Sequence, residues 1–226
     1  PSNHMVALTQ DAHGNLWFGS DGSLAFTRYG ICRYDGHTFD HYTAADGLPS
    51  DAVWCLLATP DGQVWVFTEL GPAVLSGDRF VSPPCAAGRP PYCVASARQD
   101  RTGRIWMAGL DGLCTYADGR YETCTFTPTP VRPVIWASVE DHDGNVWAGS
   151  GQALYRRQPD GTFAQVELVG TTISATGPDG RPQELSARGP LIVDAEGAVW
   201  FAAFPGGAVR YLPAAPASPS AVASAA

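Results

Sequence analysis

Two tryptophans, Trp54 and Trp136, stand at the same position of a repeated sequence pattern, eight residues before a glycine that recurs along the chain. An indole ring can stack on a flat ligand and can hold a cation over its face. The other copies carry Val6, Ala95 and Gly189 at this position. Because side chains alternate between the two faces of a strand, the position should face one consistent direction. If that direction is a central axis, the two indoles meet three smaller residues at the mouth of a channel.

Polar residues accompany these indoles and extend the candidate binding site. His4 and Arg188 lie one or two positions from the aligned position, and an insertion at residues 23–29 adds Phe26, Arg28 and Tyr29. Aromatic walls with a cation and hydrogen-bonding groups suit a planar or sugar-like ligand. Loops on a rigid scaffold often carry function, but insertions are also tolerated at loop tips without one. The alternative for Trp54 and Trp136 is that they pack between sheets like the other tryptophans.

No group of residues in the sequence indicates catalysis, and we expect no catalytic residue, no metal ion and no cofactor. The histidines are scattered, and four of them fall in turns or on and beside an outer strand: His13, His142, His37 and His41. A Ser-His-Asp triad needs side chains to converge, and no local motif here predicts it. The recurring Asp-x-x-Gly turns offer too few carboxylates in series for calcium. The cysteine spacings do not match a zinc knuckle.

The pattern that positions these residues is a turn followed by a short apolar strand that contains a tryptophan. Its first copy spans residues 11–19, and a turn followed by a β-rich run at a period of roughly 40–50 residues is typical of propellers and solenoids. An Asp-Gly pair at residues 35–36, between two alternating runs, predicts a hairpin. Such strands stack radially as sheets with large aromatic side chains between them. We assign to this core the five repeat tryptophans Trp17, Trp65, Trp106, Trp147 and Trp200.

The predicted fold is all-β: a β-propeller of five repeats, each a four-stranded antiparallel blade, with the last blade incomplete. An arc of a larger propeller is the alternative. We place the propeller at residues 1–212, with blades at about 1–48, 49–90, 91–131, 132–183 and 184–212. Residues 213–226 are rich in alanine, proline and serine and are predicted to be a tail or linker.

Three stretches of the first repeat resemble the two-component regulator propeller repeat: Asp11–Gly19, Gly30–Tyr42 and Asp46–Ser50. The later repeats keep mainly the turn and its tryptophan. The resemblance implies the periplasmic or extracellular input module of a membrane-bound bacterial signalling protein, which binds a small-molecule or oligosaccharide ligand or shapes dimerisation. It also implies that the partner signalling domains lie elsewhere in a longer parent chain, of which this sequence would be a segment.

Composition excludes other classes of partner. The net charge is −8, with no basic cluster, so we expect no nucleic-acid partner. No apolar run approaches the length of a membrane span, so we expect no direct membrane insertion of this segment. The six cysteines are compatible with disulfides in an exported domain, and equally with unpaired buried thiols.

Two other functions stay open at this stage. The first is a lyase resembling the propeller enzymes that open cyclic peptide lactones, which would have to use His4, Glu69, Glu184 or Arg188. The second is a scaffold fragment without independent activity. A binding module is favoured over an enzyme because these four residues are too few to predict a catalytic group.

Overall fold

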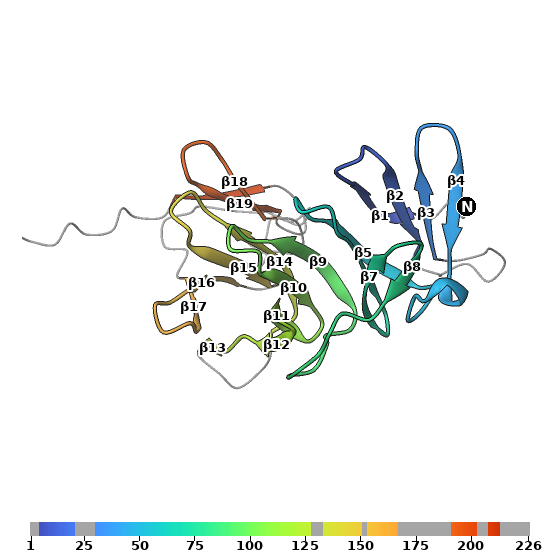
Figure 1. Ribbon diagram of the computed structural model, residues 1–226. Coiled ribbons are helices and arrows are strands. Elements are labelled where there is room, and N and C mark those ends of the chain that lie inside the picture. The colour runs from blue at the N-terminus through green and yellow to red at the C-terminus, as the bar shows by residue number, and fades with distance from the viewer. Residues whose placement is uncertain are drawn as a thin grey trace, which may run out of the picture.

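The structure, a computed structural model, describes residues 5–20, 30–127, 133–150, 153–166, 191–202 and 208–212. These residues form five β-sheets, and a short 3-10 helix, η1 (Ala44–Asp46), follows the first of them (Figure 1). Within each sheet the strands that follow one another along the chain pair antiparallel. The predicted all-β propeller of five repeats is confirmed.

The sheets are numbered one to five in chain order. Sheet one contains β1 (Met5–Gln10), β2 (Leu16–Ser20), β3 (Ile31–Tyr34) and β4 (Phe39–Tyr42). Sheet two contains β5 (Val53–Ala58), β6 (Val64–Thr68), β7 (Gly71–Ser76) and β8 (Arg79–Val81). Sheet three contains β9 (Val94–Gln99), β10 (Ile105–Gly109), β11 (Gly112–Ala117) and β12 (Arg120–Thr123). Sheet four contains β14 (Ile135–Glu140), β15 (Val146–Ser150), β16 (Leu154–Arg157) and β17 (Phe163–Gln165), and sheet five contains β18 (Leu191–Val193), β19 (Val199–Ala202) and β20 (Ala208–Tyr211).

Sheet four has a fifth strand that the repeat pattern did not predict. Strand β13 (Phe126–Thr127) pairs in parallel with β17, at the edge of the sheet farthest from β14. The backbone N–H of Phe163 donates to the carbonyl of Thr125 at 2.8 Å, and the rings of Phe126 and Phe163 stack with centroids 5.1 Å apart. Burial of this aromatic pair explains why the chain leaving sheet three runs along sheet four.

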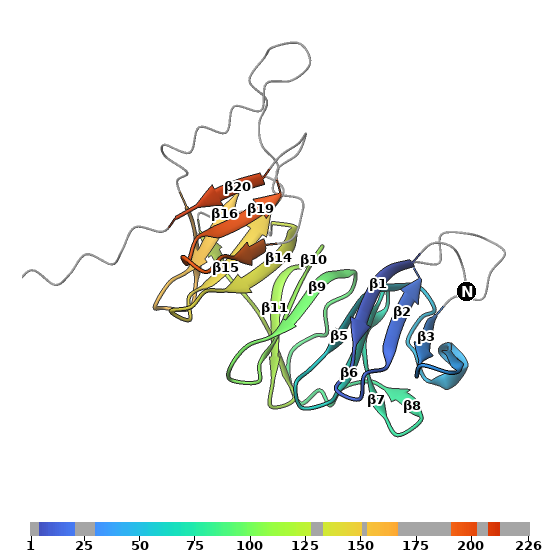
Figure 2. The same cartoon turned by 90° about the horizontal axis from the view of Figure 1, so that it is seen from above.

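The five sheets follow one another along an arc. The first strand of each sheet packs beside the first strand of the next, in the order β1, β5, β9, β14 and β18. Sheet one and sheet five stand at the two ends of the arc (Figure 2). Sheet five shows three strands in the described part of the chain, which agrees with the prediction that the last blade is incomplete.

The hydrophobic core is divided among the four contacts between successive sheets. The repeat tryptophans of the first four sheets fill these contacts, each with at most 4% of its surface exposed: Trp17, Trp65, Trp106 and Trp147. Trp200 was predicted to be buried in the same way and is only partly buried. It lies on the last sheet, where the described residues place no further sheet over it.

A hydrogen-bonded lock fixes the repeat tryptophan to the turn before it. One carboxylate oxygen of the turn aspartate accepts backbone N–H groups two and four residues later, as at Asp11 with His13 and Asn15 (both 2.9 Å). The other oxygen accepts the indole N–H six residues later, at 2.8 Å from Trp17. The same bond measures 2.7–2.9 Å in three other repeats, in the pairs Asp100–Trp106, Asp141–Trp147 and Asp194–Trp200. The lock therefore sets the orientation of the core indole from the turn.

The second repeat keeps the geometry with different groups. Thr59 replaces the aspartate, and its hydroxyl oxygen accepts the backbone N–H of Gln63 at 3.1 Å. The side-chain carbonyl of Gln63 then accepts the indole N–H of Trp65 at 3.2 Å. The indole N–H of the repeat tryptophan thus has an acceptor in all five repeats, and in the four repeats that bury the ring the burial of a polar group requires one.

Candidate functional site

The aligned position of Trp54 and Trp136 coincides with a β-bulge in each inner strand. The pairing register shifts across Val6 in β1, across Trp54 in β5 and across Trp136 in β14. In β9 the register passes from Ser96 to Val94, so that Ala95 is the extra residue. A bulge leaves one residue outside the ladder and redirects its side chain, so these four side chains project from the sheets at equivalent places.

The bulge residues are less buried than the core. Trp54 exposes 41% of its surface and Val6 exposes 43%, whereas Trp147 exposes 1%. Trp136 and Ala95 are half-buried. Trp54 therefore does not pack between sheets as the repeat tryptophans do. Whether it contacts a ligand stays a prediction.

The other predicted site residues lie outside the described residues. They are His4, Phe26, Arg28, Tyr29 and Arg188. The structure consequently brings Trp54 and Trp136 to equivalent bulges and leaves the rest of the predicted set as an expectation from sequence.

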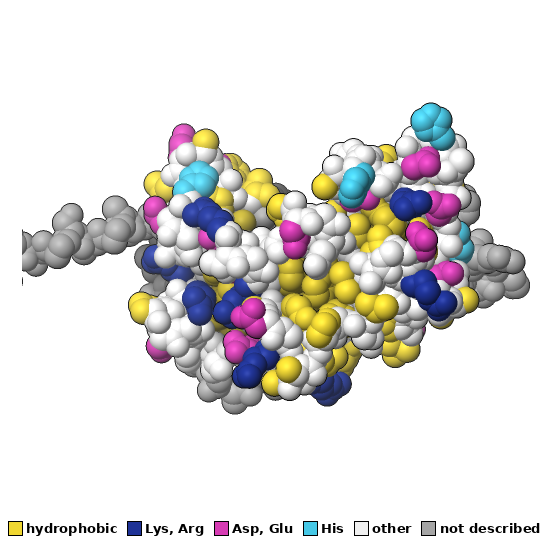
Figure 3. All heavy atoms as spheres, viewed as in Figure 1, with side chains coloured by type: hydrophobic (Ala, Val, Ile, Leu, Met, Phe, Trp, Pro, Cys, Tyr) yellow, Lys and Arg dark blue, Asp and Glu magenta, His cyan; other side chains and the backbone are white. Residues whose placement is uncertain are grey.

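Further apolar side chains gather at the same end of the sheets as Trp54. Strand β5 begins beside the end of β6, and β9 begins beside the end of β10. Exposed residues at these strand ends are Leu70, Tyr92 and Leu110. Figure 3 shows hydrophobic side chains on the surface around the middle of the arc; the notch above them lies between hairpin turns such as β1–β2, which are at the opposite end of the sheets. Sequence reasoning identified the end of the sheets on which these loops lie but not these three residues.

Two carboxylates, Glu69 and Asp111, lie at the same end of the sheets as these apolar residues. We call the whole set the loop-end face: Trp54, Leu70, Tyr92, Leu110, Glu69 and Asp111. Glu69 accepts the hydroxyl of Ser50 at 2.8 Å, and its backbone N–H donates to the carbonyl of Ala52 at 3.0 Å. These bonds tie the chain before Trp54 to the β6–β7 turn. Burial, and then the nearby charges of Glu69 and Asp111, raise the pKa of the Cys93 thiol.

The backbone is strained where this face meets sheet three. Cys93, directly before β9, has a φ of 50°, a left-handed conformation that costs roughly 1–2 kcal/mol for a residue with a Cβ. It adjoins the bulge at Ala95. Strain of this kind persists only where surrounding structure enforces it, and it concentrates at binding sites.

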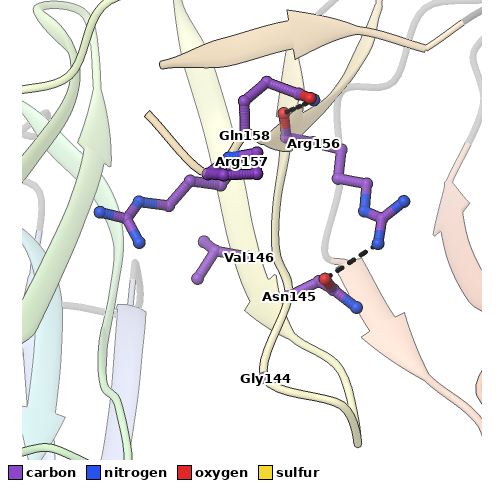
Figure 4. A pocket seen from close by; sticks show the side chains of 7 residues that line it. Gly144, Asn145, Val146, Arg156, Arg157 and Gln158 are labelled. Atoms are coloured by element: carbon purple, nitrogen blue, oxygen red, sulfur yellow. Dashed lines mark hydrogen bonds between the residues drawn. The ribbon is translucent and has the colours of Figure 1, made fainter. Parts of the chain in front are cut away.

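A pocket of about 400 Å³ lies at the other end of sheet four (Figure 4). Its walls include Asn145, Arg156 and Arg157. Arg156 donates to the side-chain carbonyl of Asn145 at 2.9 Å and lies 5.4 Å from the Trp147 ring, while Arg157 lies 5.9 Å from the Trp106 ring. The two guanidinium groups point away from one another (Figure 4), and each lies over a different indole ring. They support the sheet contacts on either side and do not converge on one ligand.

No metal-binding cluster stands out in the described ranges. Within them, no three His, Cys, Asp or Glu side chains lie close enough together to hold a metal ion. Glu69, one of the residues an enzyme would have to use, is hydrogen-bonded to Ser50. Glu184, like His4 and Arg188, lies outside the described residues.

All six cysteines are free thiols, which agrees with the unpaired alternative. Burial raises the pKa of Cys55 to about 11, that of Cys114 to about 11 and that of Cys124 to about 12. Thiols with such pKa values are poor nucleophiles at neutral pH. They act as small apolar core residues.

Comparison with known proteins supports the resemblance found in the sequence. Residues 1–22 and 47–69 match the model of the family described as two component regulator propeller. These two segments include the turns before Trp17 and Trp65 and are similar to the repeats of that family. A search of curated proteins found no match.

Solved structures with a similar fold include propellers from proteins of different kinds. The extracellular domain of a hybrid two-component system from B. thetaiotaomicron superposes with a TM-score of 0.69 at 18% identity, over 93% of this chain and 27% of that domain. Virginiamycin B lyase from Staphylococcus aureus gives 0.61 at 15% identity, over 94% of this chain and 71% of the enzyme. This chain spans about a quarter of the first domain's length. At these identities the likeness establishes the fold. No helix in the described ranges has the length and apolarity of a membrane span.

Proposed function

We propose that this propeller is the extracytoplasmic sensory module of a bacterial two-component signalling protein, and that it binds a small molecule or oligosaccharide. The observation that carries the proposal is the match of two segments to two-component regulator propeller repeats. The fold shared with the extracellular domain of a two-component system supports it. The output domains would lie outside this chain.

The chemistry of the loop-end face favours a sugar-like ligand. Trp54 and Tyr92 are aromatic residues that expose part of their surface, and Glu69 and Asp111 offer carboxylate oxygens that accept hydrogen bonds from hydroxyl groups. Arg89 lies 5.3 Å from the Tyr92 ring and holds it by a cation–π contact. Stacking on an apolar sugar face combined with acceptors at its rim would orient such a ligand.

The other proposed contacts supplement this face. His4, Phe26, Arg28, Tyr29 and Arg188 are proposed from sequence to border the same end of the sheets. Binding would act as a signal if the ligand contacts one arrangement of the module better than another. The free energy by which the ligand shifts the equilibrium between the two arrangements can be no larger than the difference in its binding free energy for them.

A thermal-shift screen tests the proposal. Oligosaccharides, peptides and aromatic acids are added to the wild type and to the Trp54→Ala/Trp136→Ala double variant, with Phe39→Ala as the control for loss of an exposed ring. A ligand at 100 times its Kd stabilises the fold by roughly 2.7 kcal/mol. We expect a hit that the control keeps and the double variant loses. A hit that the double variant keeps would remove the two tryptophans from the site, and absence of any hit would contradict ligand sensing by this segment.

The lyase alternative rests on fold likeness to virginiamycin B lyase and carries no further support here. A turnover assay with a cyclic peptide lactone, with and without a chelator, separates the two functions. Chelator-sensitive turnover would favour the enzyme, and saturable binding without turnover favours the sensor.

A further inference from the structure

The two carboxylates of the loop-end face come from neighbouring sheets. Glu69 stands in the turn between β6 and β7, and Asp111 stands in the turn between β10 and β11. The segment before β9, residues 91–93, enters sheet three on the side that adjoins sheet two, because β5 and β9 pack beside one another. This segment therefore runs between the two turns.

Backbone contacts place the segment against both turns. Gly71 directly follows the first turn, and a Cβ there would lie 3.9 Å from the carbonyl oxygen of Pro91. Gly109 directly precedes the second turn, and a Cβ there would lie 2.4 Å from the carbonyl oxygen of Cys93. Tyr92, between Pro91 and Cys93, exposes 37% of its surface. An exposed aromatic residue thus stands between two turns that each carry a carboxylate.

The Cys93 thiol shows that both carboxylates act at this place. Burial raises the pKa of this thiol, and the negative charges of Glu69 and Asp111 raise it further. Within the described residues Asp111 makes no hydrogen bond or ion pair, and the carboxylate of Glu69 accepts only the hydroxyl of Ser50. The two carboxylates therefore keep their charge and most of their hydrogen-bonding capacity for a ligand.

The Tyr92 ring already accepts a positive charge. The guanidinium group of Arg89 lies 5.3 Å from the ring centroid. Arg89 forms no ion pair within the part of the chain that the structure describes, so it does not neutralise either carboxylate by contact. An aromatic ring attracts cations over its face, and carboxylates bind ammonium groups by charge-assisted hydrogen bonds. The surroundings of Tyr92 thus have the chemistry that recognises a protonated amine.

We propose that the ligand of the loop-end face is an amino sugar, with its ammonium group bound by Glu69 and Asp111 and its ring stacked on Tyr92. The inference rests on the proposed function, because it assigns the ligand class of the same site. A neutral sugar would gain stacking and hydrogen bonds, whereas an amino sugar adds the attraction between opposite charges. A sugar acid would be repelled by the same two carboxylates.

Isothermal titration calorimetry with three oligosaccharides of one backbone tests the amine. Chitotriose, its N-acetylated form and cellotriose differ in the group on the second carbon of each sugar, which is an amine, an acetamide or a hydroxyl. We expect chitotriose to bind most tightly and salt to weaken its binding alone. Glu69→Gln and Asp111→Asn should each weaken chitotriose about fivefold and leave the neutral sugars unchanged. Asp118→Asn, on the exposed β11–β12 turn at the opposite end of sheet three, is the matched control and should bind like the wild type.

Arg89→Gln gives a second readout of opposite sign. It removes a positive charge beside Tyr92. The preference for chitotriose over cellotriose should therefore rise, and this ratio is independent of any general loss from a less well-held ring. A preference that falls would contradict an ammonium group at Tyr92.

The remaining outcomes separate this inference from the proposed function. Equal binding of the three oligosaccharides, or a preference for chitotriose that survives in both carboxylate variants, would overturn the amino sugar and leave a sensor for neutral sugars in place. Trilysine carries amines without a sugar ring, so trilysine that binds as tightly as chitotriose would overturn the sugar assignment. If no oligosaccharide binds, the inference fails. A hit with another compound in the thermal-shift screen would then uphold ligand sensing, and absence of any hit would contradict both.

Discussion

The substitution Asp141→Asn tests the lock between turn and tryptophan with almost no change in shape. One carboxylate oxygen of Asp141 accepts the backbone N–H groups of Asp143 and Asn145 at 3.0 and 2.8 Å. The other accepts the indole N–H of Trp147 and the side-chain amide of Asn145, both at 2.9 Å. Both oxygens thus face N–H donors. An asparagine would direct its own N–H₂ group at one of these pairs.

The expected loss follows from the burial of the indole. Trp147 exposes 1% of its surface, so its N–H cannot exchange a lost acceptor for water. Leaving a buried donor unsatisfied costs about 1–3 kcal/mol, and hydrogen bonds to charged groups contribute about 1.5–3 kcal/mol. We expect Asp141→Asn to lower the free energy of unfolding by about 3 kcal/mol.

Urea unfolding measures this loss, with Asp143→Asn as the matched control. Asp143 lies on the exposed tip of the same turn. The same chemical change there should alter the free energy of unfolding by no more than about 0.5 kcal/mol. A double-mutant cycle with Trp147→Phe should show a coupling of about 1 kcal/mol or more, because the two side chains share the bond. Equal effects of the two asparagine variants would refute the lock.

The pH dependence provides a second test of the same bond. Burial raises the pKa of Asp141. Hydrogen bonds from Trp147 and Asn145 lower this pKa by more than burial raises it, so the folded-state pKa lies below the ordinary value. A carboxyl with a depressed folded pKa contributes stability above its unfolded pKa of about 3.9 and loses it as the pH falls through the folded pKa. The difference in stability between wild type and Asp141→Asn should therefore shrink as the pH drops below about 4. A constant difference would contradict the assigned ionised form.

Two further predictions follow from the loops and the thiols. Gly47 has a φ of 99° and a Cβ there would lie 2.0 Å from a carbonyl oxygen of β8, whereas Gly36 has a φ of 98° and open space. Urea unfolding should show Gly47→Ala to be more destabilising than Gly36→Ala by about 2 kcal/mol, and equal losses would contradict the close approach. Alkylation followed by mass spectrometry should label exposed Cys85 first and Cys55, whose burial raises its pKa to about 11, only on unfolding. Early labelling of Cys55 would show that sheets two and three separate in the native state.

The repeat architecture could be predicted from the sequence because turn and tryptophan recur together. The lock itself was not foreseen, because the Asp-x-x-Gly turns were weighed only as candidate calcium loops. The signal was present: in the second repeat Thr59 replaces the aspartate where Gln63 supplies a substitute acceptor. Strand β13 was missed because a two-residue parallel strand depends on a partner 37 residues away, as from Phe126 to Phe163, and not on a local pattern.

The candidate site was only partly accessible to sequence reasoning. Alignment placed Trp54 and Trp136 at one repeat position. Their greater exposure relative to Trp147 coincides with a register shift that only the strand pairing reveals. Leu70 stands where the next repeat has Asp111, so its residue type does not recur, and Tyr92 lies in the loop before β9. Trp200 was wrongly assigned to the core because its sequence context matches the other repeats, whereas its burial depends on a neighbouring sheet.

The most direct test of the account is ¹⁹F NMR of the protein labelled with fluorotryptophan, with a soluble paramagnetic quencher and then with a ligand from the thermal-shift screen. Resonances are assigned by single Trp→Phe variants. We expect the quencher to broaden Trp54 strongly and to leave Trp17 and Trp147 sharp, as their exposures of 41%, 0% and 1% require. The ligand should shift the Trp54 signal and restore its sharpness. A Trp54 signal as protected as that of Trp147, or a ligand that leaves it unmoved, would contradict a binding site at the inner-strand bulges.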